Sequence, residues 1–371
     1  MPPLSIMIKP ASGRCNLRCA YCFYADETKL RSVPDRGLMP EAVCDALIEK
    51  AVNAAEGAVS FLFQGGEPTL AGLDFYRRFV SRVRELAPGG LAVRCAIQTN
   101  GTLLDEDWCR FLAENRFLTG LSLDGSRECH DRFRRDGAGK GTYDRVLRAA
   151  GMLDRAGAEY NILTVVTGAT ARHIQSVFST LCKKGFRYQQ YIPCLDPLEK
   201  ARGGEEYSLS PKQYEAFLKT LFDLWYRELE RGRYYSIRYF DNLVWMLEGR
   251  APEQCSMGGR CGVQYLVEAD GSVYPCDFYA LDQYRLGNVL YDSWEELDHA
   301  RERSGFIQAS ERLPDACREC RWLPLCRNGC RRDRMAEEDR LGRNYYCAAY
   351  AGFFAYALPR LRRVRGLLER W

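Results

Sequence analysis

Three cysteines near the N-terminus have a spacing that could hold an iron–sulfur cluster. Cys15, Cys19 and Cys22 stand in the run CNLRCAYC. Three thiolates from one short loop can bind three irons of a four-iron cube, which leaves the fourth iron open to a small bidentate ligand. A zinc site completed by histidine is the alternative, but the chain has only three histidines and none is near this run. The spacing therefore favours a cluster with one open iron.

A second concentration of cysteine lies in the last third of the chain. Its eight thiols would suffice for two further four-iron clusters or for two zinc ions, and the spacing alone does not decide between them. These residues are Cys255, Cys261, Cys276, Cys317, Cys320, Cys326, Cys330 and Cys347. The six remaining cysteines are scattered, and we expect them to be small buried apolar residues. They are Cys44, Cys95, Cys109, Cys129, Cys182 and Cys194.

Asp277 directly follows one of these cysteines, Cys276. An exposed loop carboxylate would be the ordinary interpretation. A carboxylate fixed beside a cluster ligand could instead deprotonate a substrate thiol or hydroxyl while the cluster accepts an electron. Asp277 is therefore the candidate catalytic base.

These residues must be positioned by a fold that the first 200 residues predict. Short apolar runs alternate with longer amphipathic stretches, as in parallel βα units. Such units form a curved parallel sheet whose functional residues collect at the carboxyl ends of the strands. CNLRCAYC, QGGEPT, QTNG and LDG each follow one strand. The expected strands are 4–8, 59–63, 92–97, 118–123, 160–167 and 188–192, and the expected helices include 41–55, 73–87 and 142–157.

The pattern changes after residue 210. A helix is expected from residue 211, and Asp270-Gly271 predicts a hairpin within 264–278 because it separates two alternating apolar runs. The polar segment 196–210 could be a linker or a loop that closes over substrate. We expect four parts: a barrel domain at 1–210, a helical connector at 211–254, a cysteine-rich domain at 255–347 and a C-terminal helix at 348–371.

Composition excludes several other classes of protein. The 371 residues are 46% hydrophobic and 27% charged, with a formal net charge of +4. No run reaches the ~18 apolar residues of a membrane span, and the diffuse charge does not indicate nucleic-acid binding. The N-terminus lacks the pattern of a signal peptide, so we expect a cytoplasmic protein whose thiols stay reduced.

With Tyr21 before its third cysteine and Phe23 after it, the first cysteine run resembles the signature of radical S-adenosylmethionine enzymes. The resemblance implies that S-adenosylmethionine chelates the open iron and is cleaved to a 5′-deoxyadenosyl radical. Gly65-Gly66-Glu67-Pro68 resembles the family's motif for the methionine amino group. The cofactor contacts implied in this way are Tyr21, Gly65, Gly66, Glu67, Ser122, Asp124, Arg134, Arg135 and Leu195.

The C-terminal cysteines resemble the SPASM extension of such enzymes, which implies two auxiliary [4Fe–4S] clusters and three clusters in all. By this resemblance one auxiliary cluster is held by Cys255, Cys261, Cys276 and Cys330, and the other by Cys317, Cys320, Cys326 and Cys347. The implied fold is α/β, a partial (β/α)6 TIM-like barrel with a cysteine-rich C-terminal extension and closing helices.

Longer segments of the chain, which extend beyond the cysteine motifs, resemble those of the anaerobic sulfatase-maturating enzymes. They include IKPAS, FQGGEPTLAGL, IQTNGTLLDE, PCLDPL, LFDLWY, SIRYFDNL, VEADGSVYPCDFY and NYYC. The resemblance implies oxidation of a Cys or Ser in a sulfatase, within a Cys/Ser-x-Pro-x-Arg type motif, to Cα-formylglycine. A flavodoxin or ferredoxin would supply electrons, and Asp277 would be the base. Candidate contacts to the peptide are Tyr24, Gln64, Asn100, Arg238 and Tyr239.

Two other functions stay open at this point. A ribosomal-peptide maturase that forms thioether or carbon–carbon crosslinks would share the clusters, although a first strand beginning at Leu4 leaves no room for the usual leader-binding domain. A zinc-cysteine binding module without catalysis would be colourless and free of iron.

Overall fold

The computed structural model describes residues 3–337 and 340–368. Contacts divide the chain into two compact units, and both are built from segments that are distant in sequence. Unit 1 contains the residues up to 122, with 134–160 and 263–305. Unit 2 contains 123–133, 161–262 and the residues from 306 onward.

The sheet of unit 1 has the strand order β10-β9-β8-β1-β2-β3-β4. Strand β1 pairs in parallel with β2 on one side and with β8 on the other, and β8 pairs with β9 as an antiparallel hairpin. The C-terminal hairpin is thereby attached to the first strand of the barrel. The strands are β1 (Leu4–Ile8), β2 (Ala58–Phe63), β3 (Ala92–Thr99), β4 (Leu118–Ser122), β8 (Tyr265–Val267), β9 (Ser272–Tyr274) and β10 (Gly287–Asn288).

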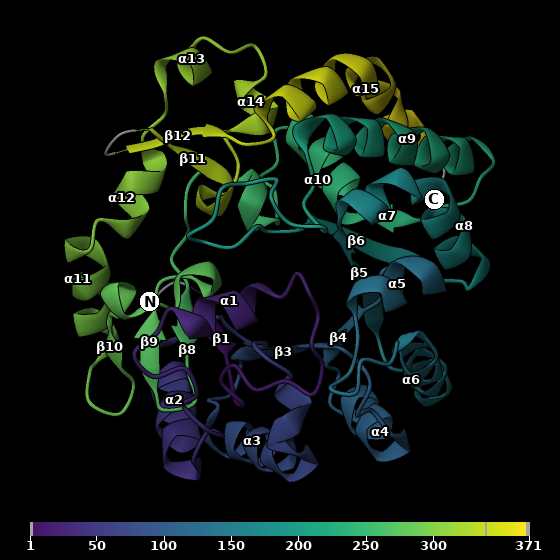
Figure 1. Cartoon of the computed structure of the whole chain (residues 1–371). Coiled ribbons are helices and arrows are strands. Elements are labelled where there is room, and N and C mark those ends of the chain that lie inside the picture. The colour runs from purple at the N-terminus through teal and green to yellow at the C-terminus, as the bar shows by residue number, and fades with distance from the viewer. Residues whose placement is uncertain (1–2, 338–339, 369–371) are drawn as a thin grey trace. The chain divides into compact units, whose positions relative to one another are not determined.

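Helices α2 and α3 pack against each other beside this sheet (Figure 1). Phe63 of β2 is fully buried and makes edge contacts with Tyr76 and Phe79 of α3, which gives the unit an aromatic core. Its helices are α1 (Phe23–Lys29), α2 (Glu41–Ala54), α3 (Leu73–Leu86), α4 (Glu106–Glu114), α6 (Tyr143–Ala156) and α11 (Trp294–Arg303). Short 3-10 turns are η1 (Pro68–Ala71), η3 (Asp277–Tyr279) and η4 (Asp282–Tyr284).

Unit 2 contains the parallel strands β5, β6 and β7 and a bundle of helices. Helix α9 begins at Pro211, where Ser210 and Gln213 form a reciprocal capping box. Helix α15 packs along α9 (Figure 1), where the Phe222 ring of α9 contacts the Phe353 ring of α15 and the Trp225 ring beside it. The main elements are β5 (Tyr160–Val166), β6 (Tyr188–Pro193), β7 (Ser236–Ile237), α5 (Arg127–Phe133), α7 (Gly168–Arg172), α8 (Ile174–Lys183), α9 (Pro211–Glu230), α10 (Arg238–Leu247) and α15 (Cys347–Leu368).

The cysteine-rich part of unit 2 consists of short pieces. They are η2 (Cys255–Met257), α12 (Phe306–Glu311), α13 (Asp315–Arg318), α14 (Leu323–Cys326), η5 (Arg331–Asp333), β11 (Arg334–Glu337) and β12 (Arg340–Asn344). The segment 196–210 is fixed to this part, because Arg332 donates a hydrogen bond to the carbonyl of Asp196 (2.6 Å) and Arg202 lies 3.6 Å from Asp333. It is a docked loop rather than an open linker.

The predicted α/β fold with its parallel strands is confirmed, and each of the six predicted barrel strands exists within one or two residues of its expected bounds. The predicted hairpin and the C-terminal helix also exist. Four of the six scattered cysteines are buried as expected, whereas Cys95 and Cys182 are only half-buried. The four-part division along the chain stays a prediction.

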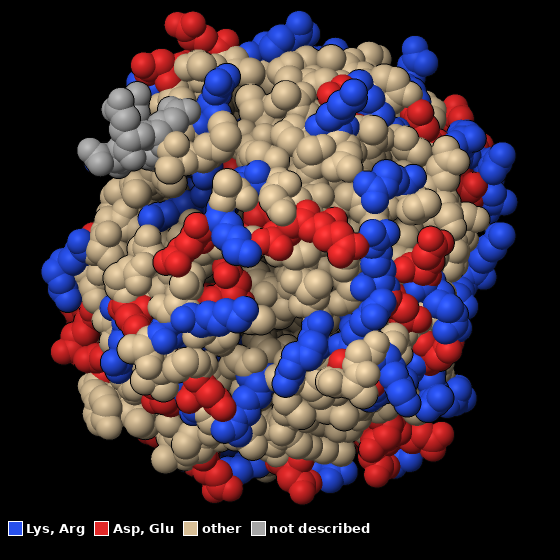
Figure 2. Space-filling model, viewed as in Figure 1, with Lys and Arg blue, Asp and Glu red and all other residues tan. Residues whose placement is uncertain are grey.

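On the face seen in Figure 2, acidic and basic side chains are interspersed. Within the described residues, no helix combines the length and the apolar character needed to cross a membrane.

Candidate active site

The first cysteine run forms the loop between β1 and α1. The Cys15, Cys19 and Cys22 side chains are half-buried, and Cys22 caps the start of α1. Burial raises the pKa of the Cys15 thiol to about 11, and nearby Cys22 contributes to the rise. The backbone N–H of Leu17 donates a hydrogen bond to the Cys15 sulfur (3.3 Å). Several thiols of one loop with backbone donors around them fit an iron–sulfur cluster.

Gly65 and Gly66 bring the end of β2 against this loop. Gly66 has a φ of +50°, and a Cβ at this position would lie 2.1 Å from the carbonyl oxygen of Arg14. A Cβ on Gly65 would lie 2.3 Å from Cγ of Lys9. The backbone N–H of Glu67 donates to the carbonyl of Arg14 (2.7 Å). The glycines therefore permit a close approach to the residue that precedes Cys15.

Glu67, expected to receive the cofactor's amino group, is buried and already accepts four hydrogen bonds. The donors are the backbone N–H and hydroxyl of Thr69 (3.1 and 2.7 Å), the hydroxyl of Thr99 (2.7 Å) and the backbone N–H of Asn100 (2.8 Å). Burial raises the pKa of Glu67, although these bonds oppose the rise. Its side chain ties the end of β2 to the end of β3.

Asn100, which is expected to contact the peptide, supports the cysteine loop. Its amide donates to the side chain of Asn16 (2.8 Å) and lies 3.8 Å from the Cys15 sulfur. Thr102 completes the link, because Asn16 donates to its hydroxyl (2.8 Å) and this hydroxyl donates to Asn100 (2.7 Å).

Asp277 lies in a buried hydrogen-bonded group with two predicted peptide contacts. Its Oδ2 accepts hydrogen bonds from the Tyr24 hydroxyl (2.6 Å) and from Gln64 (3.0 Å), and Gln64 also donates to Tyr24 (2.7 Å). Within the described structure, Oδ1 accepts no hydrogen bond. Burial and the neighbouring carboxylate raise the pKa of Tyr24 well above its usual value, so this phenol is a donor. Tyr24 and Gln64 therefore hold one oxygen of the Asp277 carboxylate.

Sequence reasoning missed a buried charged cluster beside Asp277. Lys9 lies 3.5 Å from Oδ1 of Asp277, 3.1 Å from Glu27 and 3.7 Å from Glu268. Arg31 pairs with Glu27 (2.8 Å) and Glu268 (2.6 Å). Burial would lower the pKa of Lys9, but the surrounding carboxylates outweigh this effect and raise it. A charged residue at the end of an apolar strand was the only signal of this cluster in the sequence.

The other predicted cofactor contacts are divided between the units. In unit 1, the Arg134 guanidinium lies 5.3 Å from the centroid of the Tyr21 ring. The carbonyl of Arg135 accepts a hydrogen bond from the backbone N–H of Arg18 (2.7 Å). The Ser122 hydroxyl accepts a hydrogen bond from the side chain of Gln98 (3.1 Å). In unit 2, Asp124 is buried and accepts from the backbone N–H of Val165 (2.9 Å), and half-buried Leu195 follows β6.

Arg238 and Tyr239, both predicted peptide contacts, begin α10 in unit 2. Burial raises the pKa of Tyr239 well above its usual value, and its ring lies among those of Phe240, Tyr350 and Phe353.

Two groups of thiols lie in unit 2. Burial raises the pKa of Cys330, and Cys255 and Cys261 raise it further. Burial raises the pKa of Cys326 to about 11, with further contributions from Cys317, Cys320 and Cys347. The remaining implied ligand, Cys276, belongs to unit 1, and the two auxiliary ligand sets stay a prediction. Among the described side chains, no three His, Cys, Asp or Glu converge closely enough to hold a single metal ion.

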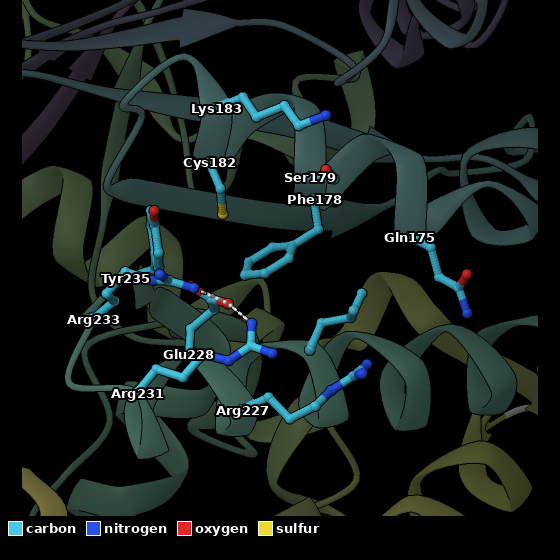
Figure 3. A pocket seen from close by; sticks show the side chains of 11 residues that line it. Gln175, Phe178, Ser179, Cys182, Lys183, Arg227, Glu228, Arg231, Arg233 and Tyr235 are labelled. Carbon is cyan, nitrogen blue, oxygen red and sulfur yellow. Dashed lines mark hydrogen bonds and ion pairs between the residues drawn. The ribbon is translucent and has the colours of Figure 1, made fainter.

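A surface hollow in unit 2 involves none of these predicted residues. It is lined by α8, by the end of α9 and by the segment before β7 (Figure 3). Glu228 accepts hydrogen bonds from Arg231 (3.0 Å) and Arg233 (2.9 Å), while Cys182 and Phe178 come from α8.

Comparisons with known proteins agree with this geometry. The model of the radical SAM superfamily matches residues 10–181, and that of an iron–sulfur cluster-binding domain, SPASM, matches residues 255–321. The parallel strands, the cysteine loop and the second cysteine region thus define a radical S-adenosylmethionine enzyme with a SPASM domain.

Relatives that match nearly the whole chain identify the family within the radical S-adenosylmethionine enzymes. The chain is 47% identical to the cysteine-type anaerobic sulfatase-maturating enzyme of Clostridium perfringens (strain ATCC 13124), covering 98% of this chain and 99% of that one. It is 30% identical to the serine-type enzyme of Bacteroides thetaiotaomicron, covering 96% and 90%. A solved structure described as native anSMEcpe with bound AdoMet and Cp18Cys peptide is 46% identical, with a TM-score of 0.94 over 99% of this chain and 100% of that one. The chain belongs to the family of anaerobic sulfatase-maturating enzymes.

Its cofactors are S-adenosylmethionine and [4Fe–4S] clusters, one in the radical SAM part and auxiliary ones in the SPASM part. The protein is therefore an enzyme and not a zinc-binding module, and the predicted cofactor classes are confirmed.

Proposed function

We propose that the chain oxidises a cysteine of a sulfatase polypeptide to Cα-formylglycine without oxygen. The 47% identity to a cysteine-type enzyme, against 30% to a serine-type enzyme, favours Cys over Ser as the residue that is oxidised. The observation that carries the chemistry is the buried carboxylate of Asp277, whose Oδ2 accepts hydrogen bonds from Tyr24 and Gln64 and whose Oδ1 lies 3.5 Å from the Lys9 ammonium.

When bound, S-adenosylmethionine and the clusters supply a radical that removes a hydrogen atom from the substrate Cβ and a site that accepts the second electron. Cys15, Cys19 and Cys22 would bind the first cluster. The two auxiliary clusters would be bound by Cys255, Cys261, Cys276 and Cys330 and by Cys317, Cys320, Cys326 and Cys347.

In this proposal the carboxylate of Asp277 takes the proton of the substrate thiol. The S–H bond breaks, an O–H bond forms on Asp277, and the sulfur forms a double bond to the carbon that has lost its hydrogen and its second electron. Water then replaces sulfur, which gives the aldehyde and hydrogen sulfide. Tyr24 and Gln64 orient the base during proton transfer because both bind Oδ2.

We further propose that the cofactor is contacted by the nine residues inferred from the sequence. Glu67 would act mainly through the backbone around it, because its side chain already has four donors. The peptide would carry a Cys-x-Pro-x-Arg type motif and contact Arg238, Tyr239 and the Tyr24, Gln64 and Asn100 region. A flavodoxin or ferredoxin would reduce the clusters, in the cytoplasm.

Asp277→Asn tests the base directly, because it retains the side-chain shape and removes the basic oxygen. Reconstituted enzyme would be incubated anaerobically with S-adenosylmethionine, reductant and a Cys-x-Pro-x-Arg peptide. We expect deoxyadenosine to form at a rate close to that of the unmodified enzyme, while formylglycine falls on the order of 10²- to 10⁴-fold. Liquid chromatography and mass spectrometry measure the two products.

Full formylglycine formation by the variant would exclude Asp277 as the base. A crosslinked peptide in place of the aldehyde, from the unmodified enzyme, would support the peptide-maturase alternative. A peptide with Ala in place of the reactive Cys is the control for background aldehyde.

A further inference from the structure

Lys9 is a buried cation next to Oδ1 of Asp277, which accepts no hydrogen bond in the described structure. Its side chain is 1% exposed, and its ammonium lies 3.5 Å from Oδ1 of Asp277. We propose that Lys9 is the positioning residue of Asp277, which fixes the carboxylate by an ion pair to Oδ1. This inference rests on the proposed function.

The hydrogen bonds to Asp277 alone hold only one side of its carboxylate. Tyr24 and Gln64 both bind Oδ2, so they leave rotation about the Cβ–Cγ bond weakly restrained. The backbone adds little order, since Asp277 begins the three-residue turn η3 and is not part of a regular helix or strand. Attraction between the Lys9 ammonium and Oδ1 supplies a second point of restraint.

Lys9 is itself held rigidly. Its ammonium donates a hydrogen bond to Glu27 (3.1 Å) and lies 4.7 Å from the centroid of the Tyr24 ring. Glu27 is fixed in turn by Arg31 and by the backbone N–H of Ala280 (2.6 Å). The stem of Lys9 passes over Gly65, where a Cβ would lie 2.3 Å from its Cγ. Gly65 is therefore required for the path of Lys9 to Asp277.

In the cluster of two cations and three carboxylates, Arg31 provides a control for Lys9. Lys9 and Arg31 are equally buried and both pair with Glu27 and Glu268, yet only Lys9 has an ion pair with Asp277. Apolar side chains usually fill such a volume at lower cost than buried ions, so a retained ammonium at this place suggests a specific role.

Two double variants separate positioning from folding. Lys9→Met with Glu27→Gln removes one buried cation and one buried anion, including the cation that contacts Asp277. Arg31→Met with Glu268→Gln also removes one of each and keeps the Lys9–Asp277 contact. Neither variant changes the net charge of the cluster, and the Lys9 pair differs from the Arg31 pair in leaving Asp277 without its cation.

The readouts are iron content, the KM for the Cys peptide, kcat, and the ratio of formylglycine to deoxyadenosine. We expect the Lys9 pair to retain iron and a KM within about twofold of the unmodified enzyme, while kcat for formylglycine and the product ratio fall on the order of 10- to 100-fold. The Arg31 pair should keep the product ratio of the unmodified enzyme.

An unchanged product ratio in the Lys9 pair would overturn the inference, and so would an equal fall in both pairs. If the Lys9 pair loses iron, Lys9→Arg is tested in its place, because this single change keeps a cation beside Asp277. If the Lys9→Arg variant does not retain most of the product ratio, the inference is also overturned. Asp277→Asn is measured in parallel. If it forms full product, the proposed function fails; if it forms none while the Lys9 pair is unaffected, only the positioning role fails.

Discussion

At the scale of single residues, the geometry of the site depends on close approach of the backbone as much as on side chains. Gly66 adopts a left-handed φ of +50° and lies against the backbone of Arg14, just before Cys15. The motif that resembles an amino-group binding site therefore also shapes the loop of the first cluster. The close approach of the backbone therefore explains why glycine is needed at these positions, independently of any contact with the cofactor.

Gly66→Ala should weaken binding of the first cluster. A Cβ would lie 2.1 Å from the Arg14 carbonyl oxygen, which is backbone and cannot move without displacing Cys15. We expect lower iron content and loss of the electron paramagnetic resonance change on adding S-adenosylmethionine, with the signals of the auxiliary clusters retained.

Gly57→Ala is the matched control for backbone strain. Gly57 also has a positive φ, of +74°, but no atom lies within 4 Å of its added Cβ. Strain at this position costs about 1 kcal/mol and should leave all clusters in place. Equal loss of iron from both variants would contradict the role of the Gly66–Arg14 contact.

At the scale of elements, the sequence predicted those helices and strands whose positions depend on local patterns of residues. The six barrel strands were predicted because apolar runs end at chemically distinctive turns, and α9 begins at Pro211 as its capping sequence indicates. Pairing of β8 with β1 was not predictable, since residues about 260 positions apart carry no local signal of contact. This pairing places the Asp277 turn beside the end of β1.

The buried charged cluster was missed for the same reason. Glu27 and Arg31 are separated by four residues, which in sequence resembles an ordinary pair on an exposed helix face. Only the tertiary contacts with Lys9 and Glu268 make them buried. Asp277 itself was found through its cysteine neighbour and the family resemblance, whereas the donors that hold its Oδ2 required the structure.

We expect the free energy of unfolding to depend on pH through Asp241, which lies near the start of α10. Asp241 is buried and accepts hydrogen bonds from Ser236 (2.6 Å) and Tyr234 (3.2 Å), and burial raises its pKa from 3.8 to about 6. The folded state thus binds this proton more tightly than the unfolded state. The resulting stabilisation is complete below pH 3.8 and is lost as the pH rises through about 6.

Asp241→Asn removes this titration. The stability of the variant relative to the unmodified protein should therefore increase by about 1–2 kcal/mol between about pH 4.5 and pH 7.5. Anaerobic urea unfolding, followed by far-ultraviolet circular dichroism at several pH values, measures the difference. A difference that stays constant over this range, or that decreases as the pH rises, would contradict the prediction.

At the scale of the whole molecule, the region from α13 to η5 obtains its stability differently from the rest of the two units. In unit 1 and in the α9–α15 part of unit 2, long elements meet through buried aromatic side chains. The region from α13 to η5 instead consists of helices of only three or four residues with four of the auxiliary cysteines among them. Such short helices are not stable alone.

Removing the iron should therefore loosen the chain locally. Metal–thiolate bonds would join these short pieces when the clusters are bound, and their loss leaves four thiols, of which Cys320, Cys326 and Cys330 are only partly buried. We expect hydrogen–deuterium exchange, measured by mass spectrometry without oxygen, to become much faster in residues 315–333 of the iron-free protein. Exchange in α9, which lies in the same unit and has an aromatic contact with α15, should change little. If iron removal accelerated exchange equally in α9 and in residues 315–333, or in neither, the clusters would not be the local source of stability in this region.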